Sequence, residues 1–395
     1  MTDQFLPYTY HSIDESDITA VTDVMRNGML TGGPLVQRLE ECFTAETGAS
    51  HAVACANGTA ALHLAAMALG WKTGDRVIVP SVTFLASANA ARFVGADVVF
   101  ADVDPDTGLM TVDTLNEAIV RGGAAVKGMI PVHLAGQCVE MPAVGEVARR
   151  HGLSILEDAC HALGTETENG PVGNCRDSDA AMFSLHPAKT VAMGEGGVVL
   201  TNDGTLASAM RRFRSHGMVY GDFTYADQAI AADGQANPWY YEMPEIGYNY
   251  RVPDILCAMG ASQMARLAAI VARRRALAAR YDTLLEPLAP ILKPLARVDY
   301  CRPAWHLYVV LIDFDALGLD RAATMRRLKS VGIGTQVHYL PVHRQPYYRR
   351  RYGDISLPGA DEYYRRALSL PLFPAMADGD VERVVAALSN IVGKG

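Results

Sequence analysis

A regular alternation of β-branched runs with Ala/Leu-rich runs between residues 50 and 205 constrains the fold most. The run HAVACA at 51–56 predicts a strand, and TAALHLAAMAL at 59–69 predicts a helix that begins at the Asn57–Gly58 turn. Strands that alternate with helices form right-handed crossovers, so we expect an α/β fold with a mostly parallel sheet covered on both faces. In such sheets, ligands bind where the chain leaves the carboxyl ends of the strands. Further strands are predicted at 75–80, 96–103, 125–134, 153–159, 179–185 and 198–203.

The rest of the chain follows a different pattern. The segment 219–247 is rich in Gly, Asp and aromatic residues and is too long for a simple connection, so a functional loop is expected there. A long helical pattern covers 252–285, and helices near 320–331 and 379–392 stand among strand-like runs. This pattern predicts a smaller α+β domain at the carboxyl end. The expected organisation is a large domain with an N-terminal arm at 1–285 and a small domain at 286–395.

Composition and charge exclude several classes of protein. A net charge of -8 argues against nucleic acid as a main partner, because phosphate backbones require a basic surface. The seven cysteines never form a CxxC pair, which favours reduced thiols over a disulfide framework or a zinc site. His338 and His343 have no acidic neighbour in their run, so no metal site is expected. No run approaches the about 20 apolar residues of a membrane helix, and the first residues lack the apolar run of a signal peptide. We therefore expect a cytoplasmic protein.

The segment 181–197, AMFSLHPAKTVAMGEGG, contains the strongest candidate for covalent chemistry. Lys189 follows a predicted strand and precedes the run from Gly194 to Gly197, whose glycines allow a close backbone approach. A lysine that forms a Schiff base must be partly desolvated, so that enough of its amine is neutral. The same spacing fits a solvated lysine on a surface turn, and the spacing alone favours that interpretation.

Other candidate residues also follow predicted strands. Asp158 ends an apolar run and is suited to pair with a protonated pyridine nitrogen, although an acidic helix cap has the same pattern. Gly58 and Thr59 open a helix, whose free N–H groups bind anions such as phosphate. Phe84 is placed to stack on a flat ring or to pack in the core, and His161 to bond a ring substituent or to fill a turn.

The order of these features is more specific than any one of them. A phosphate-binding turn, an aromatic residue, an acid and a lysine each follow a strand of one array, and this order resembles the fold-type I pyridoxal-phosphate enzymes. More narrowly, the chain resembles the DegT/StrS family of nucleotide-sugar aminotransferases along nearly its whole length. The motifs that carry the resemblance are Leu30–Pro34, Asn57–Leu62, Pro80–Phe84, Glu157–Ala159, Phe183–Lys189, Gly194–Gly197, Arg214–Gly217 and Gly247–Arg251.

The resemblance implies a large domain that binds pyridoxal 5'-phosphate and a smaller C-terminal α+β domain. It implies that Lys189 binds the cofactor covalently and moves the proton of transamination, and that Asp158 pairs with the pyridine nitrogen. Asn249 is expected to reach the cofactor phosphate of a partner subunit, which implies a homodimer with shared active sites. The ring face, the ring hydroxyl and the phosphate are expected to be bound, in that order, by Phe84, by His161, and by Gly58, Thr59 and Ser184.

Four shorter stretches resemble the family members that act in pseudaminic acid biosynthesis: Tyr8–Asp17, Met29–Gly33, Asp158–Gly164 and Gln336–Tyr339. These members move an amino group from L-glutamate to the C4 ketone of a UDP-linked 4-keto-6-deoxy-N-acetylhexosamine and release 2-oxoglutarate. Two alternatives stay open: a family member for another nucleotide keto sugar, of the perosamine or 3-keto type, and a non-catalytic regulator that binds the cofactor. A nicotinamide enzyme is set aside, because no G-x-G-x-x-G follows the first strand. The residues expected to line the sugar-nucleotide pocket are Tyr8, Leu30, Thr31, His338 and Tyr339.

Overall fold

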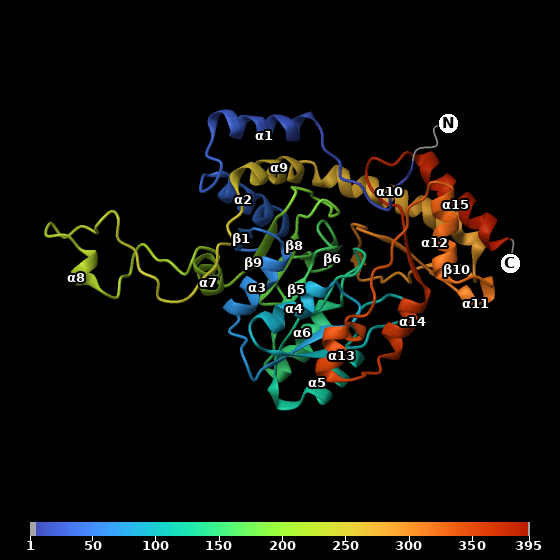
Figure 1. Cartoon of the computed structure of the whole chain (residues 1–395), viewed down its shortest axis with the longest axis horizontal. Helices are drawn as coiled ribbons and strands as arrows, with labels where there is room; N and C mark the ends of the chain where they lie inside the picture. The colour runs from blue at the N-terminus through green and yellow to red at the C-terminus, as the bar shows by residue number, and fades with distance from the viewer. Residues whose placement is uncertain (1–4, 394–395) are drawn as a thin grey trace.

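A computed structural model describes residues 5–393 and shows a central sheet of seven strands in the order β1-β9-β8-β5-β4-β2-β3 (Figure 1). Within it, β9 runs antiparallel to both of its neighbours, and the other pairs are parallel. The predicted mostly parallel sheet is therefore confirmed. The bounds are β1 (His51–Cys55), β2 (Arg76–Pro80), β3 (Asp97–Ala101), β4 (Val126–Met129), β5 (Ser154–Asp158), β8 (Ala180–Ser184) and β9 (Gly197–Thr201).

Helices surround the sheet and begin where the sequence supplies capping side chains. Asn57 accepts a hydrogen bond from the Ala60 N–H at the start of α3, and Asp14 and Asp17 form a capping box at the start of α1. The helices are α1 (Glu15–Asn27), α2 (Leu35–Thr47), α3 (Gly58–Ala68), α4 (Leu85–Phe93), α5 (Val112–Gly122), α6 (Met141–His151), α7 (Gly204–Arg214), α8 (Ala226–Ala229), α9 (Asp254–Met264), α10 (Leu267–Leu285), α11 (Phe314–Leu317), α12 (Arg321–Ser330), α13 (Pro346–Tyr352), α14 (Pro358–Arg366) and α15 (Asp378–Val392).

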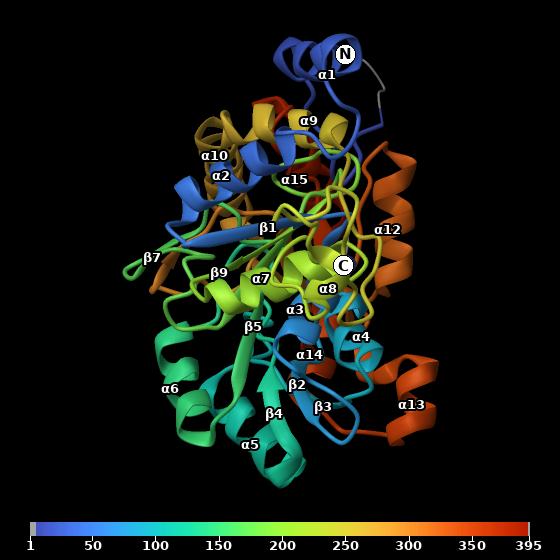
Figure 2. The same ribbon diagram turned by 90° about the vertical axis from the view of Figure 1, so that its left-hand side faces the viewer.

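Both faces of the central sheet are buried. Val53 and Val199 pack in the core cluster that includes α3, whereas Ala52 and Leu200 pack in the cluster that includes α2. Figure 2 shows α2 and α7 on opposite sides of β1. Because successive side chains of a strand point to opposite faces, a strand covered on both sides must be apolar throughout. This requirement leaves polar chemistry only at the ends of the strands.

The helical pattern at 252–285 forms two helices, α9 and α10, rather than a continuous one. Their axes meet at 60°. At the bend, Arg266 makes an ion pair with Asp17 of α1, and Gln263 accepts a hydrogen bond from the Ala192 N–H. No Gly or Pro marks this break, so local sequence does not show it. No single helix within residues 5–393 is long and apolar enough to cross a membrane, and by length and composition only this bent pair passes as a broken span.

A smaller antiparallel sheet, β10-β12-β13, forms a second layer with α10, α12 and α15. Its core contains Leu277 and Tyr281 from α10, Tyr308 from β12 and Leu388 from α15. The second half of α10 therefore belongs to this core, although the domain boundary near residue 286 stays a prediction. The strands are β10 (Leu292–Pro294), β12 (Tyr308–Ile312) and β13 (Ala367–Leu370), and a separate small sheet joins β6 (Glu166–Thr167), β7 (Gly170–Pro171) and β11 (Cys301–Arg302).

The segment 219–247 projects from the body of the molecule between α7 and α9 (Figure 1). Several of its large apolar side chains face solvent: Tyr220 is 71% exposed, Trp239 73% and Ile246 79%. A concentration of exposed apolar side chains is typical of surfaces that contact another protein or a ligand.

A buried arginine joins α10 to two distant segments. The Arg274 side chain is 1% exposed, and its guanidinium donates hydrogen bonds to the carbonyl oxygens of Trp305, His306 and Leu372 at 3.3, 3.2 and 3.1 Å. Burial lowers the pKa of Arg274 to about 10, so the group is still charged at neutral pH. Its removal would leave three buried carbonyl groups without their donor.

We predict that Arg274→Ala lowers the free energy of unfolding by about 3 kcal/mol or more, because buried acceptors lose a charged donor. The matched control is Arg280→Ala on the same helix, which removes a 43% exposed ion pair with Glu382 and should cost less than about 1 kcal/mol. Urea denaturation followed by circular dichroism measures both changes. Equal losses for the two variants would contradict the assigned role of Arg274.

Candidate active site

A cavity of about 870 Å³ opens at the carboxyl ends of β2, β5 and β8. It brings together residues predicted separately from the sequence, from both the central sheet and the C-terminal region. Their roles stay predictions, but their placement around one space agrees with a single site. The predicted residues that line it are Tyr8, Gly58, Thr59, Phe84, Asp158, His161, Ser184, Lys189, His338 and Tyr339.

Lys189 lies on a loop that leaves β8 and returns to β9. The loop is closed at its base, where the Leu185 N–H donates to the Gly196 carbonyl oxygen at 2.8 Å. Glycine is required at position 197, next to the base of this loop, because a Cβ atom there would lie 2.4 Å from the carbonyl oxygen of Asn57. The glycine run therefore brings the lysine loop against the start of α3, where the phosphate is expected.

Burial lowers the pKa of the Lys189 amine below its usual value, and Cys160 and Asp158 partly oppose this shift. The amine is therefore neutral at a lower pH than an exposed lysine amine. A neutral amine is the form that attacks a carbonyl carbon, so this environment suits covalent capture of an aldehyde.

Asp158 ends β5 and is 5% exposed. One carboxylate oxygen accepts a hydrogen bond from the Ser87 hydroxyl at 2.6 Å, and the other accepts from the Cys160 N–H at 3.2 Å. The Thr83 hydroxyl lies 2.7 Å from that of Ser87 and completes the chain of contacts. These donors orient the carboxylate toward the cavity, where it is suited to accept a hydrogen bond from a protonated ring nitrogen.

The start of α3 and the end of β8 form the anion-binding side of the cavity. A Cβ atom on Gly58 would lie 2.8 Å from that of Ser184, so only glycine lets the two segments approach so closely. Asn57 caps the N–H of Ala60, and the N–H groups of Gly58 and Thr59 need no partner within the helix. A phosphate here, an acid at Asp158 and an amine at Lys189 fit pyridoxal phosphate.

His161 and Tyr339 form a polar pair on the opposite wall. The Ala135 N–H donates to His161 Nδ1 at 3.3 Å, so the proton of the neutral ring is on Nε2. Nε2 then donates to the Tyr339 hydroxyl at 3.1 Å. Burial and the nearby Lys189 hold the pKa of His161 well below its usual value, which keeps the ring neutral. The Tyr339 hydroxyl therefore keeps its own proton for a ligand in the cavity.

The structure adds residues that the sequence analysis missed. His306 packs against His161 with ring centroids 4.4 Å apart and ring planes tilted by 39°, and burial holds the pKa of His306 well below the usual value. His63, Tyr248 and Tyr250 form an aromatic wall, with the two tyrosine rings stacked 4.9 Å apart. A histidine before a strand and an aromatic residue in a loop have no distinctive local pattern, so only their tertiary position identifies them.

Three predicted residues lie outside this cavity. Leu30 is 56% exposed, and its carbonyl oxygen accepts a hydrogen bond from the Asp254 N–H. Thr31 beside it is also exposed. Asn249 is exposed and stands between Tyr248 and Tyr250, which line the cavity, so it does not contribute to the site of its own chain.

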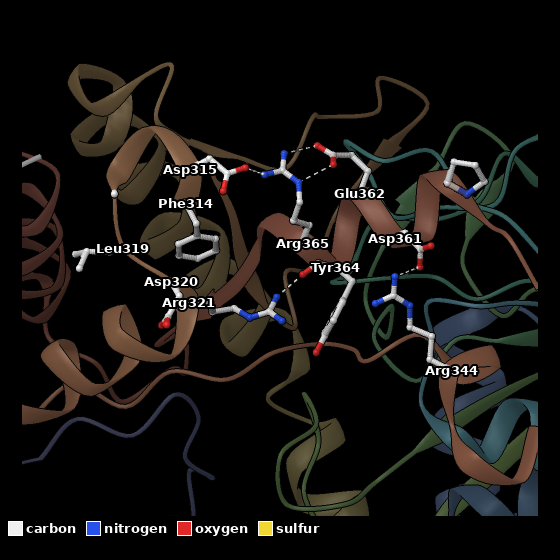
Figure 3. A pocket seen from close by; sticks show the side chains of 12 residues that line it. Phe314, Asp315, Leu319, Asp320, Arg321, Arg344, Asp361, Glu362, Tyr364 and Arg365 are labelled. Atoms are coloured by element: carbon white, nitrogen blue, oxygen red, sulfur yellow. Dashed lines mark hydrogen bonds and ion pairs between the residues drawn. The ribbon is translucent and has the colours of Figure 1, made fainter. Parts of the chain in front are cut away.

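A second cavity of about 770 Å³ lies between α11, α12 and α14 (Figure 3). The guanidinium groups of Arg321 and Arg344 lie 4.3 and 5.6 Å from the ring centroid of Tyr364. Both cations already have partners: Arg344 contacts Asp361 at 2.5 Å, and Arg321 donates to the Tyr364 carbonyl oxygen. Contacts within the protein therefore account for both cations. Lys189 and Asp158, which line the first cavity, do not line this one.

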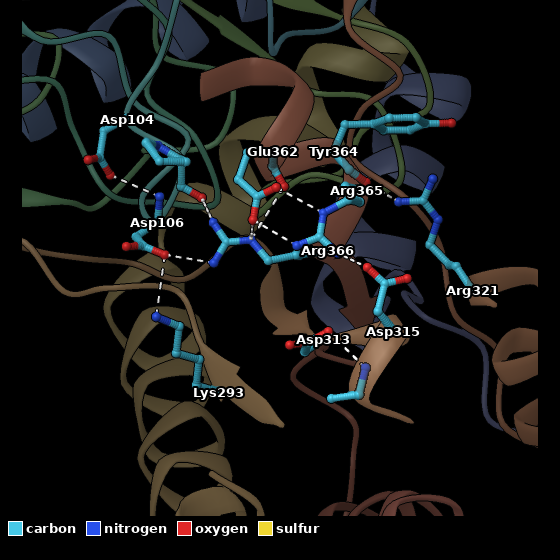
Figure 4. Close-up of polar contacts among 12 residues, drawn as sticks. Asp104, Asp106, Lys293, Asp313, Asp315, Arg321, Glu362, Tyr364, Arg365 and Arg366 are labelled. Carbon is cyan, nitrogen blue, oxygen red and sulfur yellow. Dashed lines mark hydrogen bonds and ion pairs between the residues drawn. The ribbon is translucent and has the colours of Figure 1, made fainter. Parts of the chain in front are cut away.

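The charged side chains of α14 extend from this second cavity toward the loop after β3 (Figure 4). Arg366 pairs with Asp106 at 3.0 Å, and Lys293 reaches the same carboxylate at 3.4 Å. These pairs join β10 and α14 to the loop after β3 and so hold the C-terminal region against the central sheet. Within residues 5–393, no group of three or more His, Cys, Asp or Glu side chains could hold a metal ion.

A cavity whose amine, carboxylate and anion-binding helix start would hold pyridoxal phosphate, at the edge of a mostly parallel sheet, places the protein among the fold-type I transaminases. More narrowly, the chain belongs to the DegT/DnrJ/EryC1/StrS aminotransferase family, whose model matches residues 11–389. It is accordingly a pyridoxal-phosphate-dependent nucleotide-sugar aminotransferase.

Individual relatives cover nearly the whole chain. A UDP-4-amino-4-deoxy-L-arabinose–oxoglutarate aminotransferase of Shewanella sediminis is 40% identical and covers 100% of both chains. The structure of Helicobacter pylori PseC, an aminotransferase involved in the biosynthesis of pseudoaminic acid, is 28% identical with a TM-score of 0.89, covering 99% of this chain and 100% of that one. Spr1654 of Streptococcus pneumoniae in its PLP form is 25% identical with a TM-score of 0.87 and covers 99% of both.

We predict that Ser87→Ala lowers kcat about tenfold, because Asp158 loses a charge-assisted hydrogen bond of roughly 1.5 kcal/mol or more. Steady-state kinetics measure the change, and affinity for pyridoxal phosphate gives a second measurement. Ser50→Ala is the control, since Ser50 is exposed and bonds only the distant Asn202. Unchanged kcat in Ser87→Ala would show that Asp158 is oriented without the serine.

Proposed function

We propose that the chain moves an amino group from L-glutamate to the C4 ketone of a UDP-linked 4-keto-6-deoxy-N-acetylhexosamine, the sugar of pseudaminic acid biosynthesis. The observation that most directly supports transamination is that Lys189 and Asp158 line the same cavity. The likeness to PseC over 99% of the chain supports the proposed sugar substrate. The name of the Shewanella relative supports a UDP-linked substrate, with glutamate and oxoglutarate as the amino donor and its keto product.

The residues of the cavity divide the chemistry among them. Pyridoxal phosphate, when bound, supplies the electron sink for the carbanion at the reacting carbon. Lys189 Nζ takes the proton from the α carbon of glutamate, and in the second half-reaction it delivers a proton to C4 of the sugar. The Asp158 carboxylate keeps the proton on the ring nitrogen of the cofactor. The Tyr339 hydroxyl donates a hydrogen bond to an oxygen atom of the bound cofactor or substrate. Because donor and sugar occupy one site in turn, ping-pong kinetics are expected.

A UDP-linked 4-keto pentose is the second candidate for the sugar. The Shewanella relative, at 40% identity, carries a name that specifies UDP-4-amino-4-deoxy-L-arabinose. The two candidates share the nucleotide and the reacting C4 ketone. They differ in the substituents at C2 and C5. The same catalytic residues therefore act on both sugars, and the residues that line the cavity must discriminate between these substituents.

We predict that the 4-keto-N-acetylhexosamine gives kcat/KM at least about tenfold above that of the 4-keto pentose, with products identified by NMR. GDP- and dTDP-linked 4-keto sugars and a 3-keto sugar complete the panel, and Lys189→Ala is the inactive control. A higher value for the pentose selects the second candidate, and turnover of a GDP-sugar alone refutes both. No turnover with any sugar, in a protein that binds the cofactor, indicates a regulator.

We further propose that the active enzyme is a homodimer in which each subunit completes the site of the other. Asn249 supports this proposal, because it is exposed and does not line the cavity of its own chain, although its neighbours Tyr248 and Tyr250 do. The exposed aromatic side chains of segment 219–247 support it as well, since they precede Asn249 and are available to a partner. Leu30 and Thr31, also outside the cavity, are available to the sugar in the partner's site.

Mixed dimers test this arrangement. We predict that Lys189→Ala and Asn249→Ala are each almost inactive alone, and that subunits of the two variants, unfolded and refolded together, regain roughly a quarter of wild-type activity. Half of the dimers are then mixed, and in each of these one site has both native residues. If Asn249 acted within its own chain, every site would lack one residue and no activity would return.

A further inference from the structure

Two cysteines from distant parts of the chain meet outside the active site. The Cys138 N–H donates to Cys301 Sγ at 3.5 Å, and the two thiols also hydrogen-bond to each other. Cys138 is buried at 1% exposed, whereas Cys301 is half-exposed. Cys138 and Tyr300, the residue before Cys301, line a separate cavity of about 300 Å³, so one thiol of the pair borders a space open to small molecules.

The pair is held by contacts on both sides. Cys301 lies in β11, where it pairs with Thr167 of β6. On the other side, Gln137 next to Cys138 donates to the Ala296 carbonyl oxygen at 3.0 Å and accepts from the Val298 N–H at 3.0 Å. These hydrogen bonds fix the segments that carry Cys138 and Cys301, so the fold itself holds the two sulfur atoms near each other.

The two thiols have opposite acidities. The hydrogen bond with Cys138 lowers the pKa of Cys301 to about 7 against the effect of burial, and the nearby His133 acts in the same direction. The same hydrogen bond and burial raise the pKa of Cys138. At neutral pH a substantial fraction of Cys301 is therefore thiolate, whereas Cys138 keeps its proton. In Cys42, the comparable half-exposed cysteine, burial raises the pKa instead.

We propose that Cys138 and Cys301 form a reversible oxidative modification site whose substrate is hydrogen peroxide. The Cys301 thiolate attacks a peroxide oxygen, the O–O bond breaks, and the departing hydroxide takes a proton to leave as water while Cys301 becomes a sulfenic acid. Cys138 then attacks this sulfur, the S–S bond forms and a second water leaves. The peroxide takes up the two electrons that the thiols lose. A dithiol reductant reverses the step and becomes a disulfide itself.

The position of the pair connects it to the aminotransferase site. Cys138 lies in the loop whose Ala135 N–H fixes the tautomer of His161. Cys301 precedes His306, which packs against His161, in the same segment of chain. A disulfide would therefore cross-link the two segments that hold these imidazole rings, without touching Lys189 or Asp158.

The test is a peptide map of the intact wild-type enzyme after treatment with hydrogen peroxide and alkylation of the remaining thiols. We expect a Cys138–Cys301 cross-linked peptide that disappears on reduction with dithiothreitol. We also expect iodoacetamide at pH 7 to alkylate Cys301 on the order of tenfold faster than Cys42. Both measurements need only the native protein, so they do not depend on the folding of any variant.

Variants then separate the two thiols. Cys301→Ser should abolish the cross-link, Cys138→Ser should leave a sulfenic acid at Cys301 that dimedone traps, and Cys42→Ser should form the cross-link like the wild type. Absence of the cross-linked peptide in the peroxide-treated native enzyme, or equal alkylation rates for Cys301 and Cys42, would overturn the proposal.

Discussion

Burial of the central sheet on both faces is the constraint on which the rest of the structure depends. A strand between two layers of helices has no room for polar side chains along its length, so chemistry is possible only where the strands end. Ser184, Asp158 and the Phe84 loop all stand at such ends. The cavity follows from this geometry, because the carboxyl ends of parallel strands lie along the same edge of the sheet.

Within the cavity, desolvation separates the groups that carry charge from those that do not. Burial lowers the pKa of His161, His306 and His338, the last to about 3, so the imidazoles are neutral at physiological pH. Asp158 has the Ser87 hydroxyl and a backbone N–H as donors to its carboxylate. The site thus combines the Asp158 carboxylate, an amine of lowered pKa and three neutral hydrogen-bonding rings. This combination suits proton transfer at carbon.

Much of the fold and part of the site could be predicted from the sequence. Strands and helices of the central layer were recognisable because their apolar runs and capping residues act locally, as Asn57 does for α3. The break between α9 and α10 was missed because its cause lies in contacts with α1 and the lysine loop rather than in a Gly or Pro. Ser87 and His306 were missed because an isolated serine or histidine acquires meaning only from the group it faces.

The sequence by itself determined the layered α/β class, the order of the phosphate turn, acid and lysine, and through their motifs the family. These are properties of short segments, whose spacing and residue types are read directly. Only the tertiary structure decided which side chains share a space: that His306 packs against His161, that Asn249 does not line the site of its own chain, and that Cys138 meets Cys301. Such contacts join residues far apart in the chain, and packing of the whole molecule determines them.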